Sequence, residues 1–535
     1  MFSKFLFIFV IYRNIAYAFK CGTGQLKNEP YMISNDKVNN NKRRLSTEFT
    51  PIKIKVDYKL LSNQVNIEQL NYFKEVFSNV VYYFNSLLLV QHDNIDIDEE
   101  SIKKHCFIDD IENGAGKIFY DYDLIIIPYI EDSLDKNVLA AASPCLYLSN
   151  FKPIGGVVEI NQDLVMSRYD SKDFLEKLLL HELSHVLCFH PIYFSKLNLT
   201  EYEIKNNRNH SYITSPKVLE KARIHFNCKD IKGIQLEDQG GEGSIGAHWE
   251  ARYMLGDYMI STDYPEVVIS DITLALFEDT GFYKVNYYTG GLFRFGKNQG
   301  CSFLEEKCVK NKKEGLETDF PNDFCLEDSK AFCGSSHIAR GICVIREVEE
   351  DLEEDYQYFD DSNLGGGFSI ANYCPVSSDF RTGNSFEKYY NNPNNCKNGL
   401  TIFSQYGEKI GDNSFCFESS LLPRYSLSNV VSTQNRSICY NIECDKFRKE
   451  IIIYIDSLKV YCPGNRTVLT NPEGFIGNIL CPEYNLVCSS EVQCNDMLDC
   501  IIKNSTASRN TYLYLKSKIF EINFIFYLII VLYFI

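Results

Sequence analysis

The chain has 535 residues, of which 45% are hydrophobic and 23% are charged. This balance excludes a disordered or collagen-like protein, and the length predicts two to four domains. The formal net charge of −17 argues against nucleic-acid binding, because the densest basic run is only Lys42-Arg43-Arg44. The 20 cysteines indicate disulfide bonds and an oxidising compartment.

The N-terminus is typical of a secretory signal peptide over residues 1–18. An apolar run from Phe5 to Tyr12 precedes Ala16-Tyr17-Ala18, which is a small-residue cleavage site. Sequons for N-glycosylation agree with secretion, and their asparagines are Asn198, Asn209, Asn435, Asn465 and Asn504.

The C-terminal stretch from Ile519 to Ile535 is apolar except for Glu521 and Asn523. As a helix it would span roughly 25 Å, which is short of the ~30 Å hydrocarbon core of a membrane. Small residues at 504–508 and a polar spacer precede it. This layout predicts a GPI-attachment signal over 504–535, with Ser505 as the attachment site. A tail-anchored helix and a plain buried segment remain as alternatives.

The mature sequence begins with a polar segment without periodicity at residues 19–48. Alternating apolar and polar residues then predict a strand over 51–58, and a helical apolar pattern follows over 68–89. Residues 122–128 predict a buried strand. Residues 156–161 predict another strand, and the glycines that open it favour a position at the edge of a sheet.

Cysteine density divides the chain near residue 300. Only four cysteines fall between residues 49 and 300, whereas fifteen fall between Cys301 and Cys500. The second part is therefore predicted to be a disulfide-rich domain with irregular strands and few long helices. The fold class that follows is α+β, with helices and sheet in the first half and a mostly irregular or β second half.

Residues 171–187 predict a helix with a broad apolar surface, and the motif H-E-L-S-H at 181–185 is set into it. His181 and His185 lie about 40° apart around such a helix, so both imidazoles can reach one metal ion. Glu182 projects beside them, where a carboxylate can hold a metal-bound water and accept its proton. Burying these polar groups is costly without a metal, which favours a catalytic zinc over incidental histidines.

A catalytic zinc takes a third protein ligand and keeps one position open. Three residues qualify from the sequence: Cys188, which is on the same helical face as His181, then His190, and finally His248 far downstream. Spacing alone leaves the choice among them open.

Three features together make the sequence resemble the leishmanolysins. They are the motif at 181–185, the segment Gly246–Glu250, and Met259 eleven residues after His248. Leishmanolysins are metzincin zinc endopeptidases of the cell surface. The similarity runs in order across roughly residues 50–500. Its further motifs are Asp279–Tyr283, Gly300–Leu304 with Cys308, Gly365–Phe368 with Tyr373–Pro375, Cys439–Tyr440 with Cys444, Tyr461–Pro463 and Leu480–Pro482.

The resemblance implies one zinc ion bound by His181, His185 and His248, with Glu182 as the general base. Met259 would be the Met-turn residue, which forms an apolar floor beneath the histidines. The implied function is the hydrolysis of peptide bonds in proteins or peptides by a zinc-activated water. The implied location is the cell surface, reached by secretion and kept by a GPI anchor or by the hydrophobic tail.

The implied fold is a metzincin-like catalytic domain with a mixed sheet, followed by the cysteine-rich domain. The expected divisions are a signal peptide at 1–18, a pro-segment at 19–48, an N-terminal catalytic subdomain at 49–190, an insertion at 191–247, a Met-turn subdomain at 248–300, the cysteine-rich domain at 301–503 and the attachment signal at 504–535.

One residue departs from the family pattern. Cys188 stands where the family has a glycine three residues after the second histidine. Glycine takes positive φ in a sharp turn at little cost, so a cysteine implies strain of about 1 kcal/mol, a shifted turn or a thiolate that competes for zinc. For the Met-turn residue, Met254 is a weaker alternative to Met259, because its spacing does not fit.

A site altered by Cys188 would make the protein a non-enzymatic surface adhesin with the same fold. This is the alternative function, and the intact Glu182 argues against it. In the enzyme, substrate would bind in an extended conformation along the strand predicted at 156–161.

Cys21 is the candidate for a latency switch. The resemblance implies a propeptide cysteine that ligates the zinc, and Cys21 is the only candidate, although no histidine flanks it. If Cys21 and Cys188 both stay unpaired, 18 cysteines remain, which suffice for nine disulfides. In the alternative, Cys21 pairs with another cysteine. Activation would follow cleavage near residues 42–44, a run that could equally be a solvated loop.

Overall fold

The computed structural model describes residues 31–32 and 48–488, apart from internal gaps. These gaps are 94–96, 113, 115–120, 132–137, 162–171, 206–207, 242, 263, 265, 288–292, 314, 380–393, 398 and 425–433. The predicted signal peptide, Cys21, residues 42–44 and the tail with Ser505 lie outside the described residues. Among the described residues, no helix is long and apolar enough to cross a membrane.

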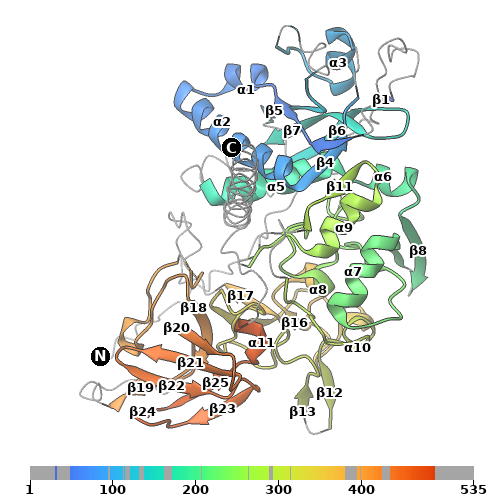
Figure 1. Cartoon of the computed structure of the whole chain (residues 1–535). Coiled ribbons are helices and arrows are strands. Elements are labelled where there is room, and N and C mark those ends of the chain that lie inside the picture. The colour runs from blue at the N-terminus through green and yellow to red at the C-terminus, as the bar shows by residue number, and fades with distance from the viewer. Residues whose placement is uncertain are drawn as a thin grey trace, which may run out of the picture.

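A five-stranded mixed sheet lies in the upper part of Figure 1. β6 and β7 are antiparallel, whereas the other neighbouring strands are parallel. The strand order is β1 (Tyr31–Met32), β6 (Ala140–Tyr147), β7 (Pro153–Ile160), β5 (Leu124–Ile130) and β3 (Ile54–Val56).

Two long helices pack on this sheet. α2 (Ile67–Leu87) begins with a capping box, in which the side chains of Asn66 and Gln69 accept hydrogen bonds from each other's backbone N–H. α5 (Lys172–Leu187) packs against α2, β6 and β7. Both helices match the helical patterns of the sequence closely, because those patterns record which side chains are buried.

The strand predicted over 51–58 is divided between two sheets. β2 (Phe49–Pro51) pairs with β4 (Leu88–Gln91), whereas β3 pairs with β5. β4 also pairs with β11 (Tyr283–Val285), so a strand directly after α2 connects the N-terminal residues to the chain near residue 284.

β5 is buried on both faces, which explains its unbroken apolar sequence. Leu124 and Ile126 belong to the large core that α2 and α5 share. Ile125 and Ile127 belong to a second cluster, together with residues of α3 (Glu99–Cys106). The sheet is therefore covered on both sides.

The prediction of an edge strand at 156–161 is wrong, because β7 lies between β5 and β6. Its glycines serve a close approach instead. A Cβ atom on Gly156 would lie 2.3 Å from Cγ1 of Val186 on α5, so glycine lets the helix approach the sheet closely.

Residues 191–300 form the middle part of the molecule in Figure 1. A three-stranded sheet in the order β10-β9-β8 adjoins α7, and α7 packs against α9. The segment 191–247 therefore shares its core with 248–300. The elements are α6 (Pro191–Lys196), β8 (Thr200–Lys205), β9 (Arg208–Ile213), α7 (Pro216–Phe226), β10 (Ile234–Gln235), α8 (Ala251–Met254) and α9 (Asp271–Asp279).

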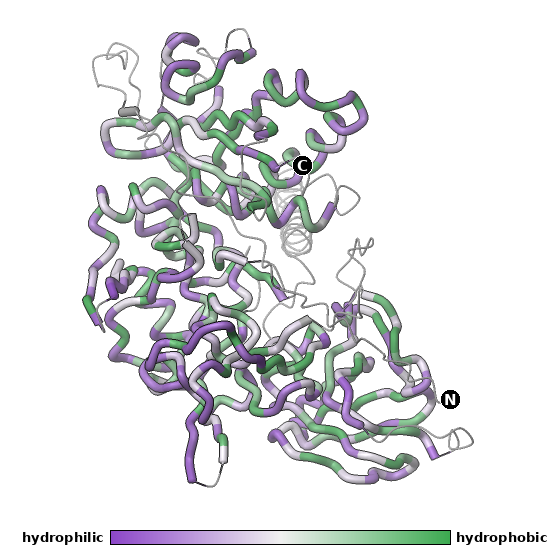
Figure 2. Tube along the Cα trace, turned by 180° about the vertical axis from the view of Figure 1, so that it is seen from behind, coloured by the Kyte–Doolittle hydropathy of each residue, from purple (hydrophilic) through white to green (hydrophobic). Residues whose placement is uncertain are grey.

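A six-stranded antiparallel sheet forms the C-terminal part, with an apolar cluster of its own. Figure 2 shows hydrophobic residues along its strands, whereas β12 (Lys310–Lys312), in the projecting hairpin with β13 (Gly315–Glu317), is hydrophilic. The strands in order are β22 (Leu458–Cys462), β21 (Glu450–Ile455), β20 (Arg436–Asp445), β18 (Ser414–Ser419), β25 (Asn478–Cys481) and β23 (Thr467–Thr470).

The described residues form eight disulfides, and Cys188 is the free cysteine among them. The disulfide prediction is confirmed, and six of the bonds lie wholly beyond residue 301. The pairs are Cys106–Cys145, Cys228–Cys301, Cys308–Cys374, Cys325–Cys343, Cys333–Cys416, Cys396–Cys439, Cys444–Cys488 and Cys462–Cys481.

Candidate metal centre

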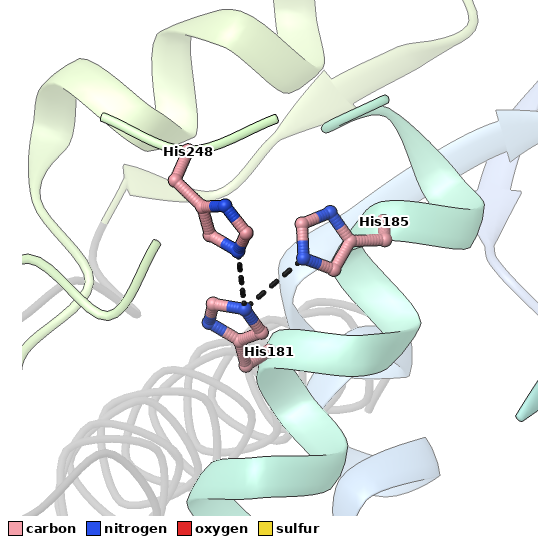
Figure 3. A group of neighbouring side chains, drawn as sticks. All are labelled: His181, His185 and His248. Atoms are coloured by element: carbon pink, nitrogen blue, oxygen red, sulfur yellow. Dashed lines mark hydrogen bonds between the residues drawn. The ribbon is translucent and has the colours of Figure 1, made fainter. Parts of the chain in front are cut away.

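Three histidines from two distant segments come together beside α5. Figure 3 shows His181 and His185 on successive turns of that helix, with His248 facing them from the downstream segment. The Nε2 atom of His181 lies 3.1 Å from Nε2 of His248 and 3.0 Å from Nε2 of His185. Two nitrogen ligands on a tetrahedral zinc are about 3.3 Å apart, so this spacing fits such an ion.

The other ring nitrogen of each histidine has a backbone partner. Nδ1 of His181 lies 2.6 Å from the carbonyl oxygen of Tyr258. Nδ1 of His185 lies 2.6 Å from the carbonyl oxygen of Phe189, and Nδ1 of His248 lies 3.1 Å from that of Ser244. A carbonyl can only accept, so each Nδ1 carries the proton. The three Nε2 atoms then present lone pairs to one another, and a bound cation would satisfy all three at once.

Burial keeps these imidazoles neutral. It lowers the pKa of His181 to about 4, and it lowers the pKa of His185 and His248 well below the ordinary value. His185 and His248 are fully buried, and His181 is nearly so. A neutral imidazole is the form that binds a metal, so the site is prepared for one.

The segment around His248 is held by backbone pairing with the residues after β10. The Glu237 N–H donates to the His248 carbonyl at 2.9 Å, and the Gly246 N–H donates to the Glu237 carbonyl at 2.8 Å. Gly246 has a φ of +71°, which glycine adopts without strain. The indole of Trp249 packs in the core and donates to Thr273 at 2.7 Å, which anchors the segment on α9.

Glu182 lies between the two helical histidines on α5, and its side chain is completely buried. Met259 is also completely buried. It lies in a turn in which Asp257 accepts a hydrogen bond from the Met259 N–H at 2.8 Å. The Met259 carbonyl in turn accepts from the Trp249 N–H at 2.9 Å, so this turn is tied to the segment that carries His248.

Tyr258 is a site residue that the sequence analysis missed. Its carbonyl accepts from His181, and its hydroxyl lies 2.6 Å from the hydroxyl of Ser184 on α5. Its only sequence signal is its position next to Met259. A backbone acceptor can be any residue type, so the sequence does not reveal that role.

Comparison with known proteins agrees with this geometry. The family model for leishmanolysin, peptidase family M8, matches residues 114–494. This chain belongs to the leishmanolysin family. Membership implies a metal cofactor, because the family consists of metallopeptidases, and it does not favour the adhesin alternative.

Curated relatives carry the same family name. A leishmanolysin homolog of Crithidia fasciculata is 29% identical over 366 residues, which cover 66% of this chain and 54% of the relative. Leishmanolysin of Leishmania donovani is 29% identical over 67% of this chain and 59% of its own length. A leishmanolysin-like peptidase of Drosophila melanogaster is 30% identical over 52% of this chain and 44% of its own. The chain thus spans roughly half the length of these relatives.

The two other candidates for the third ligand in this leishmanolysin-family chain lie outside the histidine group. Cys188 is buried in the large apolar core, and burial raises the pKa of its thiol well above the ordinary value. It is therefore a neutral thiol rather than a thiolate. The imidazole of His190 caps α6, where Nδ1 accepts from the Ile192 N–H at 3.2 Å.

Cys188 does not strain the end of α5. Its φ is not positive, so the strain expected for a cysteine in a left-handed turn is absent. The N–H groups of Cys188 and Phe189 both donate to the Ser184 carbonyl, at 2.9 and 2.8 Å. This shared acceptor ends the helix and turns the Phe189 carbonyl toward His185.

Proposed function

We propose that this protein is a zinc-dependent endopeptidase in which His181, His185 and His248 hold the metal. The observation that carries the proposal is the convergence of three neutral Nε2 atoms in a buried site. Membership of the leishmanolysin family supports it. Zinc bound there would polarise the scissile carbonyl and make water nucleophilic at neutral pH.

Glu182 is proposed as the general base. Its carboxylate accepts a proton from the attacking water and then donates that proton to the leaving amine of the cleaved peptide. The position of Glu182 on α5, directly after His181 in the sequence, would keep the carboxylate beside the metal. Tyr258, Phe189 and Ser244 hold the histidines in the required tautomer through their carbonyls.

Substrate is proposed to bind as an extended strand along β6 rather than along β7. β7 is paired on both sides, so its backbone groups are already used. β6 runs beside α5, and the hydroxyl of Ser143 on β6 lies 3.4 Å from Nε2 of His190, just beyond the end of that helix. An extended peptide can add to such a strand through backbone hydrogen bonds.

Residues 19–48 are proposed to keep the enzyme latent. β1 belongs to this segment and pairs in parallel with Leu146 and Tyr147 of β6, so it occupies the strand that the substrate needs. Cys21 would act as the zinc-binding cysteine of the same segment. Cleavage after Arg44 would release both.

The protein is proposed to be secreted, glycosylated and attached to the cell surface. The many disulfides support secretion. The sequon asparagines within the described ranges are all exposed, as glycosylation requires; they are Asn198, Asn209, Asn435 and Asn465. The GPI signal at 504–535 would supply the attachment.

The test is casein digestion by protein cleaved after Arg44, with the uncleaved chain assayed in parallel. The cleaved wild type should digest casein, and a zinc chelator should stop it. Glu182→Ala should lower the rate by about a thousandfold or more while zinc stays bound in a 1:1 ratio. Glu203→Ala, at an exposed position on β8, is the matched control and should leave the rate unchanged. Equal digestion by wild type and Glu182→Ala would refute the proposal.

A further inference from the structure

A second group of potential metal ligands lies close to the segment that carries His248. It consists of Glu237, Asp238 and Glu250, and each offers a carboxylate oxygen within 4.8 Å of the others. Oxygens that bind one calcium ion, each about 2.3–2.6 Å from it, lie up to about 5 Å apart. The three carboxylates therefore have the spacing of a shared oxygen-ligated cation.

Glu237 and Glu250 are completely buried and Asp238 is partly buried, and carboxylate oxygens of the cluster lack hydrogen-bond partners among the described residues. Glu250 is completely buried; its Oε1 accepts from the Arg252 N–H at 3.1 Å, and within the described part of the chain Oε2 has no hydrogen-bond partner. Oδ2 of Asp238 lies 2.7 Å from Nδ1 of His210, whereas Oδ1 likewise lacks a partner among the described residues. A buried carboxylate oxygen without a partner is costly, and a cation removes that cost.

Nearby cationic side chains are directed elsewhere. The guanidinium of Arg252 donates to the carbonyls of Phe303 and Glu306 and stacks over aromatic rings. Arg208 pairs with Glu353. Burial raises the pKa of Asp238 even though the charges of His210 and Arg208 lower it, so these groups do not fully compensate for its charge.

We propose that Glu237, Asp238 and Glu250 form a calcium site, separate from the histidine centre. All its protein ligands would be carboxylate oxygens, which suit a hard cation such as Ca²⁺ and are poorer ligands for zinc than the imidazoles nearby. The flexible coordination of Ca²⁺ tolerates an irregular set of carboxylates, whereas Mg²⁺ demands near-octahedral geometry.

Such an ion would bridge two chain segments that hold His248 in position. Glu237 and Asp238 lie on the first segment, shortly after β10, and Glu250 lies on the second, two residues beyond His248. Backbone hydrogen bonds already join these segments: the Glu250 N–H donates to the Gln235 carbonyl at 3.1 Å, and the Glu237 N–H donates to the His248 carbonyl at 2.9 Å. Calcium would reinforce this pairing by neutralising the repulsion between the carboxylates.

The single tryptophan of the chain, Trp249, makes the site measurable, because it directly precedes Glu250. Terbium replaces calcium at oxygen sites, and a nearby indole excited at 295 nm transfers energy to it. Zinc-loaded protein, in which the histidine centre is filled, should show saturable terbium luminescence. Millimolar Ca²⁺ should displace the terbium, and Mg²⁺ at the same concentration should displace it much less.

Two variants and a control decide the assignment. Glu250→Gln and Asp238→Asn should each weaken terbium binding by roughly tenfold or more, since ligand charge sets the affinity. Asp238 lies nearer the surface, so its variant reports on the site even if Glu250→Gln fails to fold. Glu220→Gln, an exposed change on α7, should bind like the wild type. Absent luminescence, or equal affinity in Asp238→Asn and wild type, would overturn the proposal, and neither result depends on proteolysis.

Discussion

In residues 48–300 a large apolar core holds helices and sheet together, whereas residues 403–488 combine a smaller core with disulfides. The first region encloses one disulfide, Cys106–Cys145. The second encloses Cys444–Cys488 and Cys462–Cys481, and two further bonds attach it to preceding residues. A small sheet buries little surface and needs such cross-links, whereas a larger core does not.

The difference bears on the metal centre. The three histidines come from distant segments that pack in the large apolar core, so their geometry depends in part on packing volumes around α5. The C-terminal sheet depends instead on its redox state. The large core also continues past residue 301 to Val376, so the rise in cysteine density precedes the point at which the core changes.

The largest expected effect is on the C-terminal sheet when its disulfides are reduced. A thiol reductant should unfold the C-terminal sheet, because each disulfide contributes about 2–5 kcal/mol to a small domain. Replacing Cys462 and Cys481 together by serine removes a bond that closes 19 residues, and it should cost about 3 kcal/mol. Hydrogen exchange read by mass spectrometry should show loss of protection in β20–β22 while α5 stays protected. Persistent protection of β20–β22 after complete reduction would contradict the comparison.

The next effect is a pH dependence at the junction of the regions. Asp323 is buried, and its Oδ1 accepts from the Gly296 N–H at 3.2 Å. Burial raises its pKa from 3.8 to about 6, so folding favours the neutral acid. This contribution to stability is present in full below pH 3.8 and is lost as the pH rises through about 6.

Asp323→Asn keeps an acceptor for Gly296 and stays neutral at every pH. Relative to wild type, it should therefore gain up to about 3 kcal/mol in the free energy of unfolding between pH 4 and pH 7. Urea unfolding at unit steps of pH measures this gain. Asp361→Asn, at an exposed position, should show no such trend. A constant difference between Asp323→Asn and wild type would show that Asp323 does not titrate with folding.

The sequence predicted those elements whose local residue pattern alone indicates a helix or a strand. The expected helix at 171–187 is α5, because periodic apolar residues and the pair His181 and His185 are local features. The strand at 51–58 was predicted as one element, yet Ile52 and Ile54 follow separate pairings. Strand order depends on distant partners, which a single sequence does not specify.

The position of β7 shows the same limit. Glycine in a strand is typical of an edge, a bulge or a close approach, and only the neighbouring helix tells these apart. His248 was one of three open candidates by spacing, and only the family resemblance selected it. The carbonyls of Phe189 and Ser244 have no sequence signature at all, although they orient two of the three imidazoles.

The smallest effect tests whether packing around α5 sets the metal geometry. In Gly156→Ala the new Cβ would lie 2.3 Å from Cγ1 of Val186, the residue after His185, so α5 must shift. The change should cost about 2 kcal/mol, and it should weaken zinc binding several-fold, measured by competition with a zinc chelator. Gly155→Ala is the control, because the atoms nearest to its new Cβ belong to Leu146 on β6, at 3.0–3.3 Å, and not to α5. Adding Val186→Ala to Gly156→Ala makes room for the new methyl group and should restore zinc affinity. If the double variant regains stability but not zinc affinity, packing around α5 does not set the metal geometry.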